Sequence, residues 1–477
     1  SMHVPDPQSV RCKIDHPIVD SDGHVVESLP ALTEYMRRIG GSDVADRFIG
    51  SSPTYSSRRS PLLDRLDPER PRTMRRAIPA WWTLPAAARD RATGFLPRLM
   101  HERLDELGID FSVLYPSVGL TCMGHPDDAL RTVACRAVNT YLADALDGLG
   151  DRMAAAAVIP MHTPDEAVAE LDHAVGQLGF KAVLLNSYVA RPMPDAGPGA
   201  QWLDVLGLDS VHDYDPVWAR CVELGVAVTV HSPTMGVELR QSSTRYMYNH
   251  IGTFAASADA FAKAVFFGGV THRFPTLNFG FMECGVSWGV QLLCDLIGRW
   301  DKRGGRHIGL LDPDLVDAGE WDDLLLRYGG DLFADPSLRD AMRGQSDNPP
   351  VETDDFRACG IEGPEDIVAQ FDRFFFGCEA DEATIPWAFA RSVNPHGALL
   401  QPVLGSDLGH WDVADMREVV PEAYELVEDG QLDADQFRAF ACDNAIRLHG
   451  GMNAGFFDGT PVAVYARKVL AGEPGID

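Results

Sequence analysis

Short apolar segments recur along the chain, each bounded by turn residues or by the start of a helix-like stretch. Eight of them have the length and the β-branched content of buried strands. They cover residues 17–20, 111–115, 155–161, 182–186, 227–231, 277–283, 374–379 and 403–407. Because these segments are apolar almost throughout instead of alternating with polar residues, they predict strands that are covered on both faces.

Amphipathic helices are predicted between several of these strands. The clearest begins at Thr163, where Thr-Pro-Asp-Glu combines a capping box with a proline at the first helical position. Val168, Leu171 and Val175 then recur at intervals of three and four residues, and Gly179 supplies the stop. Strands that alternate with helices indicate parallel pairing through right-handed crossovers. The sequence therefore predicts an α/β fold, a closed, TIM-like (β/α)8 barrel, with a doubly wound sheet as the structural alternative.

Three stretches interrupt this repeat and are interpreted as loop insertions in a single barrel domain that spans residues 1–477. Residues 40–95 are rich in Arg, Pro and Ser, residues 187–215 carry Pro, Gly and Asp, and residues 300–370 are charged and contain proline. On a barrel, insertions that follow a strand lie over the C-terminal face, where enzymes of this fold keep their active sites.

The composition limits the class of partner. The chain has 70 acidic residues against 41 Lys and Arg, which leaves a net charge of −29. This excess argues against binding to nucleic acid or to an anionic membrane surface, because both are bound through clustered Lys and Arg. The nine cysteines are scattered without a C-x-x-C pair, and no run of about 18 apolar residues predicts a membrane span. We therefore expect a cytoplasmic protein with reduced cysteines.

Residues able to bind a metal lie at the ends of the first, fifth and eighth predicted strands. Residues i and i+2 of an extended segment point to the same side, so Asp22 and His24 can reach one ion together. His231 and Asp407 could complete a set of two histidines and two carboxylates, since the eighth strand adjoins the first in a closed ring. Such mixed ligands suit Zn²⁺, and also Mn²⁺ or Fe²⁺. Taken singly, such a histidine is more often a hydrogen-bonded structural residue, and such a carboxylate is often a helix cap. The joint pattern at three strand ends is what indicates a metal site.

Three further residues are candidates for catalysis beside Asp407. Glu283 ends the sixth predicted strand, where a desolvated carboxylate can act as a general acid or base, or can add a ligand to the ion. His250 follows the loop after the fifth strand and could overhang the metal, or could cap a helix. His410 lies three residues after Asp407 and could orient that carboxylate or contact the substrate.

Two other groups of charged residues have weaker claims on the site. Glu379, Asp381 and Glu382 follow the seventh strand and are interpreted as a solvated loop, with a role in lining the site as the alternative. Arg58 and Arg59 in the first insertion could clamp a substrate carboxylate, since arginine binds carboxylates through two hydrogen bonds. The alternative for this Arg-rich stretch is a solvated surface role.

As a set, these motifs resemble the amidohydrolase-related branch of the amidohydrolase superfamily. That branch includes aminocarboxymuconate-semialdehyde decarboxylase and the metal-dependent aromatic acid decarboxylases. The resemblance covers most of residues 15–455 and fades in the three insertions. It is carried by Asp22-Gly23-His24, by the Val-Thr-Val strand before His231, by Gly405-Ser406-Asp407 with His410-Trp411-Asp412, and by supporting strings at 104–110, 179–183, 273–279 and 444–450.

The resemblance implies a distorted, TIM-like (β/α)8 barrel with one divalent metal ion, bound by Asp22, His24, His231 and Asp407. We expect the ion to be Zn²⁺, with Mn²⁺ or Fe²⁺ as alternatives. The resemblance also implies a small-molecule carboxylate substrate and a homodimer. Two positions depart from the family pattern. Those decarboxylases usually place a catalytic histidine where this chain has Glu283. The lysine that bridges two metals at the end of strand 4 is missing, which argues against a binuclear centre.

Three functions stay open on these residues. The first is a decarboxylase, a C–C lyase of an aromatic or unsaturated acid, in which Asp407 or Glu283 protonates the carbon that loses CO₂. The second is a metal-assisted hydrolase, in which Asp407 deprotonates the water that attacks an amide, lactone or related carbonyl. The third is a barrel that has lost its chemistry and only binds. We favour the decarboxylase, because a single-metal pattern without the strand-4 lysine resembles that branch.

Overall fold

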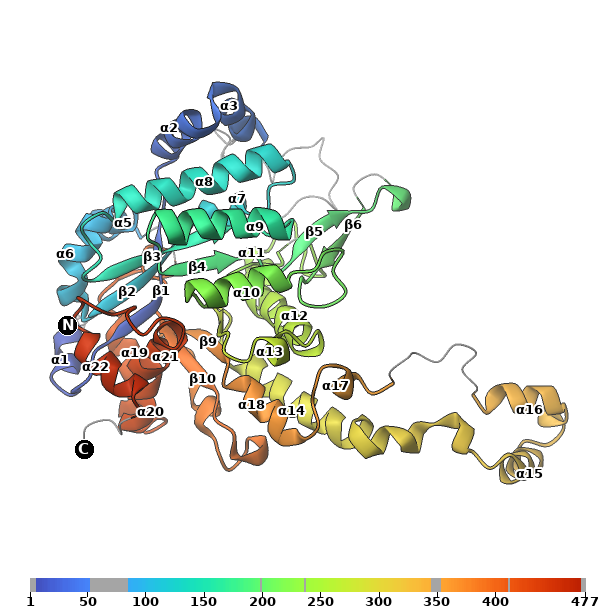
Figure 1. Cartoon of the computed structure of the whole chain (residues 1–477). Helices are drawn as coiled ribbons and strands as arrows, with labels where there is room; N and C mark the ends of the chain where they lie inside the picture. The colour runs from blue at the N-terminus through green and yellow to red at the C-terminus, as the bar shows by residue number, and fades with distance from the viewer. Residues whose placement is uncertain are drawn as a thin grey trace.

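Eight parallel strands form a ring at the centre of the molecule, in the order β1-β2-β3-β4-β7-β8-β9-β10 (Figure 1). The computed structural model describes residues 6–51, 85–197, 200–235, 237–344, 353–410 and 412–472. The strands are β1 (Val19–Val25), β2 (Phe111–Pro116), β3 (Met153–Ile159), β4 (Ala182–Leu185), β7 (Val228–Val230), β8 (Phe279–Phe281), β9 (Phe374–Glu379) and β10 (Gln401–Gly405). Each overlaps a predicted apolar segment, although several ends differ by two or more residues, so the predicted TIM-like barrel is confirmed.

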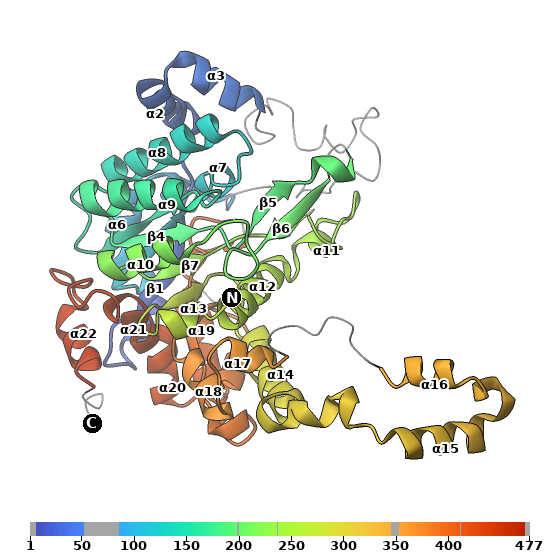
Figure 2. The same cartoon turned by 45° about the vertical axis from the view of Figure 1, so that its right-hand side comes forward.

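Helices pack around the outside of this ring (Figures 1 and 2). The helices of the barrel wall are α6 (Pro97–Leu107), α7 (Gly119–Cys122), α8 (Asp128–Ala145), α9 (Pro164–Leu171), α10 (Asp215–Leu224), α11 (Tyr246–His250), α12 (Thr253–Phe267), α13 (Val270–Arg273), α14 (Ser287–Arg303) and α18 (Pro364–Phe371). The segments that flank the ring at the two ends of the chain are α1 (Pro7–Arg11), α2 (Leu29–Gly40), α19 (Val419–Glu428), α20 (Ala434–Arg438), α21 (Asn444–Gly450) and α22 (Ala463–Leu470).

The capping box predicted for α9 is present. The Thr163 hydroxyl accepts from the backbone N–H of Glu166 at 3.2 Å, and the Glu166 carboxylate accepts from the N–H of Thr163 at 3.3 Å. Beyond Leu171 the chain continues as one π-helical stretch, Asp172–Gln177, before it turns at Gly179. The helix therefore begins and ends where the sequence predicts.

The ring is closed between β1 and β10 by hydrogen bonds and by one buried carboxylate. The backbone N–H of Asp407 donates to the carbonyl of Asp22 at 2.9 Å, and that of His24 donates to Leu408 at 2.8 Å. The fully buried side chain of Asp20 accepts from the hydroxyl groups of Ser112 on β2, at 2.6 Å, and of Ser406 beyond β10, at 2.7 Å. Burial raises the pKa of Asp20 to about 6, although these bonds favour its ionised form.

The insertions contain regular structure, contrary to a reading of them as plain loops. The first carries α3 (Ser42–Ser51) and α5 (Ala88–Phe95), and the second contains an antiparallel hairpin of β5 (Val189–Pro192) and β6 (Gln201–Asp204). The third holds α15 (Ala318–Gly329), α16 (Pro336–Met342) and α17 (Asp355–Ala358). Arg58 and Arg59 lie outside the described residues.

Two further observations bear on the composition. Within the described ranges, none of the helices combines the length and the apolarity needed to cross a membrane. All nine cysteines are free thiols, and most of them are buried.

We expect Asp20→Ala to lower the free energy of unfolding by about 2–4 kcal/mol, because it leaves two buried hydroxyls and two backbone N–H groups without their acceptor. Urea denaturation in the presence of a chelator would measure the loss. Asp15→Ala, at an exposed position five residues earlier, is the control and should change stability by less than about 0.5 kcal/mol. Equal losses in the two variants would contradict a role for Asp20 in closing the ring.

Candidate active site

The first two polar residues of the site lie on strand β1. Asp22 and His24 lie within the strand, not beyond its end, and are 2% and 0% exposed. Their alternate spacing places both side chains on one side of β1. The Nε2 atom of His24 lies 3.5 Å from Oδ1 of Asp22. The two residues thus form one buried pair, as the D-x-H pattern predicts.

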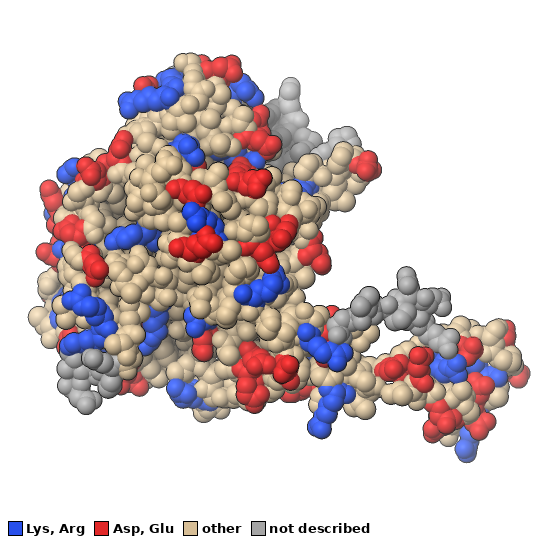
Figure 3. All heavy atoms as spheres, in the orientation of Figure 1, with Lys and Arg blue, Asp and Glu red and all other residues tan. Residues whose placement is uncertain are grey.

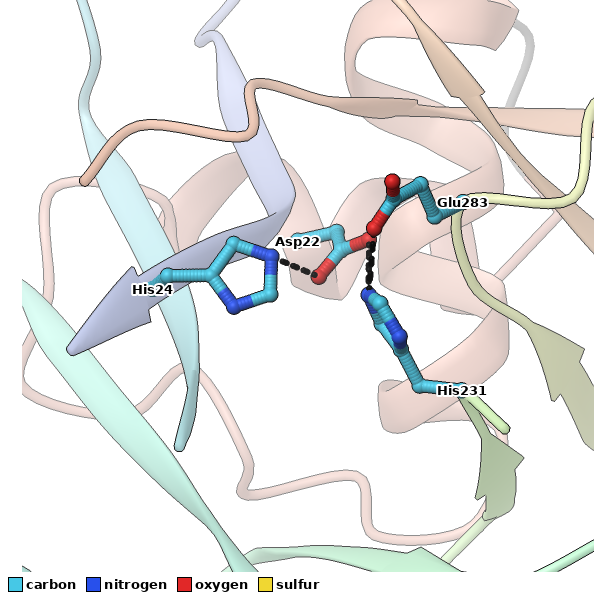
Figure 4. Close-up of side chains that lie close together, drawn as sticks. All are labelled: Asp22, His24, His231 and Glu283. Atoms are coloured by element: carbon cyan, nitrogen blue, oxygen red, sulfur yellow. Dashed lines mark ion pairs between the residues drawn. The ribbon is translucent and has the colours of Figure 1, made fainter. Parts of the chain in front are cut away.

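His231 and Glu283 approach this pair from the next two strands of the ring. His231 follows β7, and its Nε2 atom lies 3.3 Å from Oδ2 of Asp22 and 3.0 Å from Oε2 of Glu283. Glu283 follows β8. Figure 4 shows the side chains of Asp22, His24, His231 and Glu283 converging on one small region.

Asp407 joins the group from the side of His24. Its Oδ1 atom lies 3.1 Å from Nε2 of His24 and 2.9 Å from Nδ1 of His410. The rings of His24 and His410 stack with centroids 3.4 Å apart and planes 10° apart. The other ring nitrogen of His410 shares a hydrogen bond of 2.8 Å with the hydroxyl of Ser117. His410 therefore contacts the carboxylate that it is predicted to orient.

Two of these carboxylates lie on left-handed backbone. Glu283 has φ of 54° and Asp407 has φ of 51°. A residue with a side chain rarely adopts such a conformation, which costs of order 1–3 kcal/mol and concentrates at functional sites. β8 and β10 each end two residues earlier than the apolar pattern predicts, and the left-handed residue follows in the turn after the strand.

The buried donor atoms fit a divalent cation. Among the described residues, Oδ1 of Asp22, both ring nitrogens of His24 and of His231, and both carboxylate oxygens of Asp407 are buried without a hydrogen bond. An unsatisfied buried polar group costs about 1–3 kcal/mol, so a native protein rarely keeps several together unless another group binds them. Nitrogen and carboxylate ligands in this ratio suit Zn²⁺, Mn²⁺ or Fe²⁺.

The donors form two overlapping sets, in each of which the ligand atoms lie within 4.8 Å of one another. One contains Asp22, His24, His231 and Glu283, and the other contains His24, Glu283, Asp407 and His410. Neither set contains all four residues predicted as ligands, because Asp407 is grouped with His24 but not with Asp22 or His231. His24 and Glu283 belong to both sets. The position of Glu283 is compatible with the extra-ligand role that the sequence leaves open.

Opposite charges fix the protonation of Asp407 and its partners. Burial alone would raise the pKa of Asp407, but the imidazoles of His410 and His24 outweigh it and hold that pKa well below its usual range. Burial would lower the pKa of His410, and Asp407 raises it instead. Likewise, burial would lower the pKa of His231, but Asp22 and Glu283 raise it well above the ordinary value. Asp407 is consequently a carboxylate held in its ionised form.

A second layer of acid groups lines the site. The sequence interpretation offered this role for Glu379 only as the alternative to a solvated loop, and it did not single out Asp412 as a site residue. Carboxylate oxygens of Glu283, Glu379, Asp407 and Asp412 lie within 4.8 Å of one another. Burial, followed by the charges of Glu283 and Asp407, raises the pKa of Glu379 to about 9. Burial, Asp407 and Glu283 raise that of Asp412 to about 7. Without a bound ion, Glu379 therefore holds its proton to higher pH than an ordinary glutamate does.

The interpretation of the acidic stretch after the seventh strand as a solvated loop is wrong for Glu379 and Glu382. Glu379 closes β9 and lines the site, because the neighbouring strand ends bring Glu283 and Asp407 against it. Glu382 accepts from the backbone N–H of Val286 at 3.1 Å and so supports the start of α14. Neither role has a local sequence signal, since each depends on a turn from another strand.

His250 reaches the edge of the site from α11. One of its ring nitrogens lies within 4.8 Å of carboxylate oxygens of Glu283 and Asp412. Its ring also stacks on Tyr246, with centroids 5.3 Å apart. In contrast, Lys181 lies away from the site and donates to the carbonyl of Phe456 at 2.7 Å, in keeping with the absence of a bridging lysine at the end of β4.

Glu27 holds the loop that carries Ser117, and the sequence analysis did not single out either residue. The Glu27 carboxylate is buried and accepts from the N–H groups of Ser117, Val118 and Gly119 at 3.0, 2.8 and 3.0 Å. Ser117 in turn contacts His410. This chain of contacts joins segments some 90 and 290 residues apart, which no local motif reveals.

Known proteins resemble the chain at two levels. In sequence, the family model described as Amidohydrolase matches residues 45–322. Decarboxylase orsB of Emericella nidulans is 29% identical over 192 residues, which cover 36% of this chain and 51% of that protein. The chain thus spans about half the length of this curated relative.

In structure, an amidohydrolase from Mycobacterium avium subsp. paratuberculosis K-10 superposes with a TM-score of 0.51 at 16% identity, over 92% of this chain and 98% of that one. A dihydroxybenzoic acid decarboxylase from Polaromonas sp. JS666, solved with manganese and the inhibitor 2-nitroresorcinol, gives a TM-score of 0.48 at 14% identity, over 93% and 100%. The first of these likenesses shows a shared fold. Because the family model spans more than half of the 477 residues, the chain belongs to the amidohydrolase family.

Proposed function

We propose that this protein is a metal-dependent decarboxylase, a carboxy-lyase that acts on a small aromatic or unsaturated carboxylic acid. The observation that carries the proposal is the buried set of histidine and carboxylate atoms that have no hydrogen-bond partner at the mouth of the barrel. Partial similarity to a decarboxylase supports loss of CO₂ over hydrolysis as the reaction.

Asp22, His24, His231 and Asp407 would hold one divalent ion, with Zn²⁺ as the first candidate and Mn²⁺ or Fe²⁺ as alternatives. We assign Glu283 to the same shell, because its Oε2 atom lies 3.0 Å from the Nε2 atom of His231. When bound, the ion supplies positive charge that orients the substrate carboxylate and withdraws electron density as CO₂ leaves.

The carbon that loses CO₂ keeps an electron pair and must accept one proton. Asp407 is held ionised by His410 and His24, so it is a poor donor of that proton. Glu379 keeps its proton near neutral pH because burial and the neighbouring carboxylates disfavour its charge. We therefore assign the proton transfer to the Glu379 carboxyl group, in place of the Asp407 or Glu283 that the sequence proposes. His410 then positions Asp407 and does not itself meet the substrate carbon.

Metal binding is the first prediction of this model. We expect the chelator-treated chain to take up about one Zn²⁺ or Mn²⁺ in ICP-MS, and to gain about 2.7 kcal/mol of stability at a free ion concentration 100 times the dissociation constant. The double variant Asp22→Asn/His231→Ala should take up none, because it loses two of the buried ligands. His212→Ala, at an exposed histidine, should bind like the wild type. Equal uptake by the double variant would place the ion elsewhere.

Turnover tests the reaction class. Metal-loaded protein should release CO₂ from a member of a panel of hydroxylated benzoic acids and unsaturated acids. Asp407→Asn should lower kcat/KM by roughly 10²–10⁴-fold, since it removes a buried charged ligand. Asp43→Asn, whose side chain is 85% exposed, is the control. Hydrolysis of amides or lactones without CO₂ release would contradict the decarboxylase and support the hydrolase. Binding without turnover would support an inactive barrel.

The pH dependence tests Glu379. The protonated form of Glu379 is the active one, so kcat should fall as pH rises through the pKa of this residue. That pKa is about 9 without the ion. It is lower when the ion is bound, because the positive charge of the ion offsets the charges of Glu283 and Asp407. Glu379→Gln should lower kcat by about 10²–10⁴-fold and remove this basic limb. Metal content should stay unchanged, and Glu362→Gln at an exposed site should have no effect. A basic limb that persists in the Glu379 variant would assign the titration to another group.

A further inference from the structure

A serine, a histidine and an aspartate lie in line at the mouth of the barrel, and the decarboxylation proposed above leaves the serine without a chemical role. The hydroxyl oxygen of Ser117 lies 2.8 Å from Nε2 of His410, and Nδ1 of the same ring lies 2.9 Å from Oδ1 of Asp407. The two contacts use opposite nitrogens of one imidazole. This is the order of contacts in which a nucleophile, a general base and an orienting carboxylate act together.

The protons in this line can be placed from the contacts. Asp407 is ionised and can only accept, so it favours a hydrogen on the nearer ring nitrogen of His410, which is Nδ1. The neutral ring then presents the lone pair of Nε2 to Ser117. The Ser117 hydroxyl has a second acceptor in the carbonyl of Val25 at 3.1 Å, but Nε2 is nearer. The hydroxyl proton can therefore pass to His410 when the serine oxygen forms a bond.

All three residues are held in place before any substrate binds. The ring of His410 stacks on that of His24, with centroids 3.4 Å apart and planes 10° apart. The turn at 117–119 donates three backbone N–H groups to the buried carboxylate of Glu27, at 3.0, 2.8 and 3.0 Å. Asp407 is 3% exposed. A nucleophile and a base that are fixed in this way need little reorganisation in order to react.

The serine and the histidine are accessible, in contrast to the aspartate. Ser117 is partly exposed in the turn that follows β2, and the side chain of His410 is 19% exposed. This turn lies at the C-terminal edge of the ring, where enzymes of this fold bind their substrates. A small molecule at the mouth of the barrel can thus reach the hydroxyl oxygen.

We propose that Ser117 is a nucleophile and that the protein hydrolyses small, uncharged acyl esters through an acyl-serine intermediate. This activity goes beyond the decarboxylation. The uncharged class follows from the surroundings, because carboxylate oxygens of Glu283, Glu379 and Asp412 lie within 4.8 Å of those of Asp407. Figure 3 also shows Asp and Glu side chains distributed over one face of the chain, whose net charge is −29. An anionic ester would be repelled as it approaches.

The reaction runs in two steps. In the first, the oxygen of Ser117 forms a bond to the carbonyl carbon of the ester while Nε2 of His410 takes the hydroxyl proton. The bond between that carbon and the alcohol oxygen breaks, and His410 gives the proton to the departing alcohol. In the second step a water molecule attacks the acyl group in the same way, and His410 returns a proton to the oxygen of Ser117. One ester and one water thus give one acid and one alcohol.

This hydrolysis should be slow for a serine enzyme. The three N–H groups of the turn at 117–119 already bind Glu27, so they do not stabilise negative charge on the acyl oxygen. A positioned base alone typically contributes about 10²–10⁴-fold. We expect the release of p-nitrophenolate from p-nitrophenyl acetate to exceed the rate without protein by roughly this factor.

Covalent labelling tests the nucleophile directly. A fluorophosphonate, applied to the metal-loaded full chain at about pH 8.5, should add about one phosphonyl group per chain, which peptide mass spectrometry should place on Ser117. His410→Ala should lower the labelling rate at least about 100-fold, because it removes the base. Ser337→Ala, whose exposed hydroxyl donates to Asp335 at 2.6 Å, is the control and should be labelled like the wild type. An unlabelled Ser117, or labelling that is unchanged in His410→Ala, would overturn the proposal.

Ester hydrolysis separates Ser117 from a reaction assisted by the ion. The wild-type chain should hydrolyse p-nitrophenyl acetate at rates that agree within about threefold before and after treatment with a chelator. Ser117→Ala should lower this rate at least about 100-fold while it keeps the metal content of the wild type, which excludes unfolding as the cause. Hydrolysis that survives in Ser117→Ala and disappears with the ion would overturn the proposal. Neither assay measures CO₂, so the outcome does not depend on the decarboxylase.

Discussion

The arrangement of the site depends on the closure of the strand ring between β1 and β10. Two backbone hydrogen bonds and the buried Asp20 carboxylate join segments that lie almost 390 residues apart in the sequence. Without this closure, Asp22 and His24 would have no fixed distance to Asp407. The same interaction therefore completes the core and assembles the polar groups, so the stability of the barrel and the geometry of the site are set by the same few atoms.

Much of the architecture could be predicted from the sequence, because buried parallel strands and capped helices have local patterns. The eight apolar segments, the capping box of α9 and the D-x-H pair are of this kind. The sequence left the role of Glu379 open and gave none to Asp412, because the environment of both residues arises from the turns after three different strands. Glu27 and Ser117 were missed because their contacts join distant segments. The insertions carry helices and a hairpin where only loops were expected, since mixed polar composition conceals short elements.

Neighbouring carboxyl groups in the site have widely different pKa values. His24 and His410 contact Asp407 and lower its pKa, which favours the ionised carboxylate. Glu379 is buried beside other carboxylates, and both effects raise its pKa and oppose its ionisation. Two residues of the same chemical type thereby acquire opposite properties within a few ångströms. This separation explains why one carboxyl group suits ion binding and the other suits proton transfer. A bound divalent ion would stabilise this arrangement, because its positive charge offsets the repulsion among the carboxylates of Asp22, Glu283 and Asp407.

The left-handed backbone of Glu283 and Asp407 has a consequence for how this protein responds to selection for stability. At these two positions glycine is the residue that best tolerates the conformation, and it would also remove a buried charge. Glycine at either place should therefore give a more heat-resistant barrel with a damaged site. Stability favours glycine at these two positions, whereas function requires the carboxylates. A screen that selects only for heat resistance would therefore select substitutions of Glu283 and Asp407, the residues on which function depends.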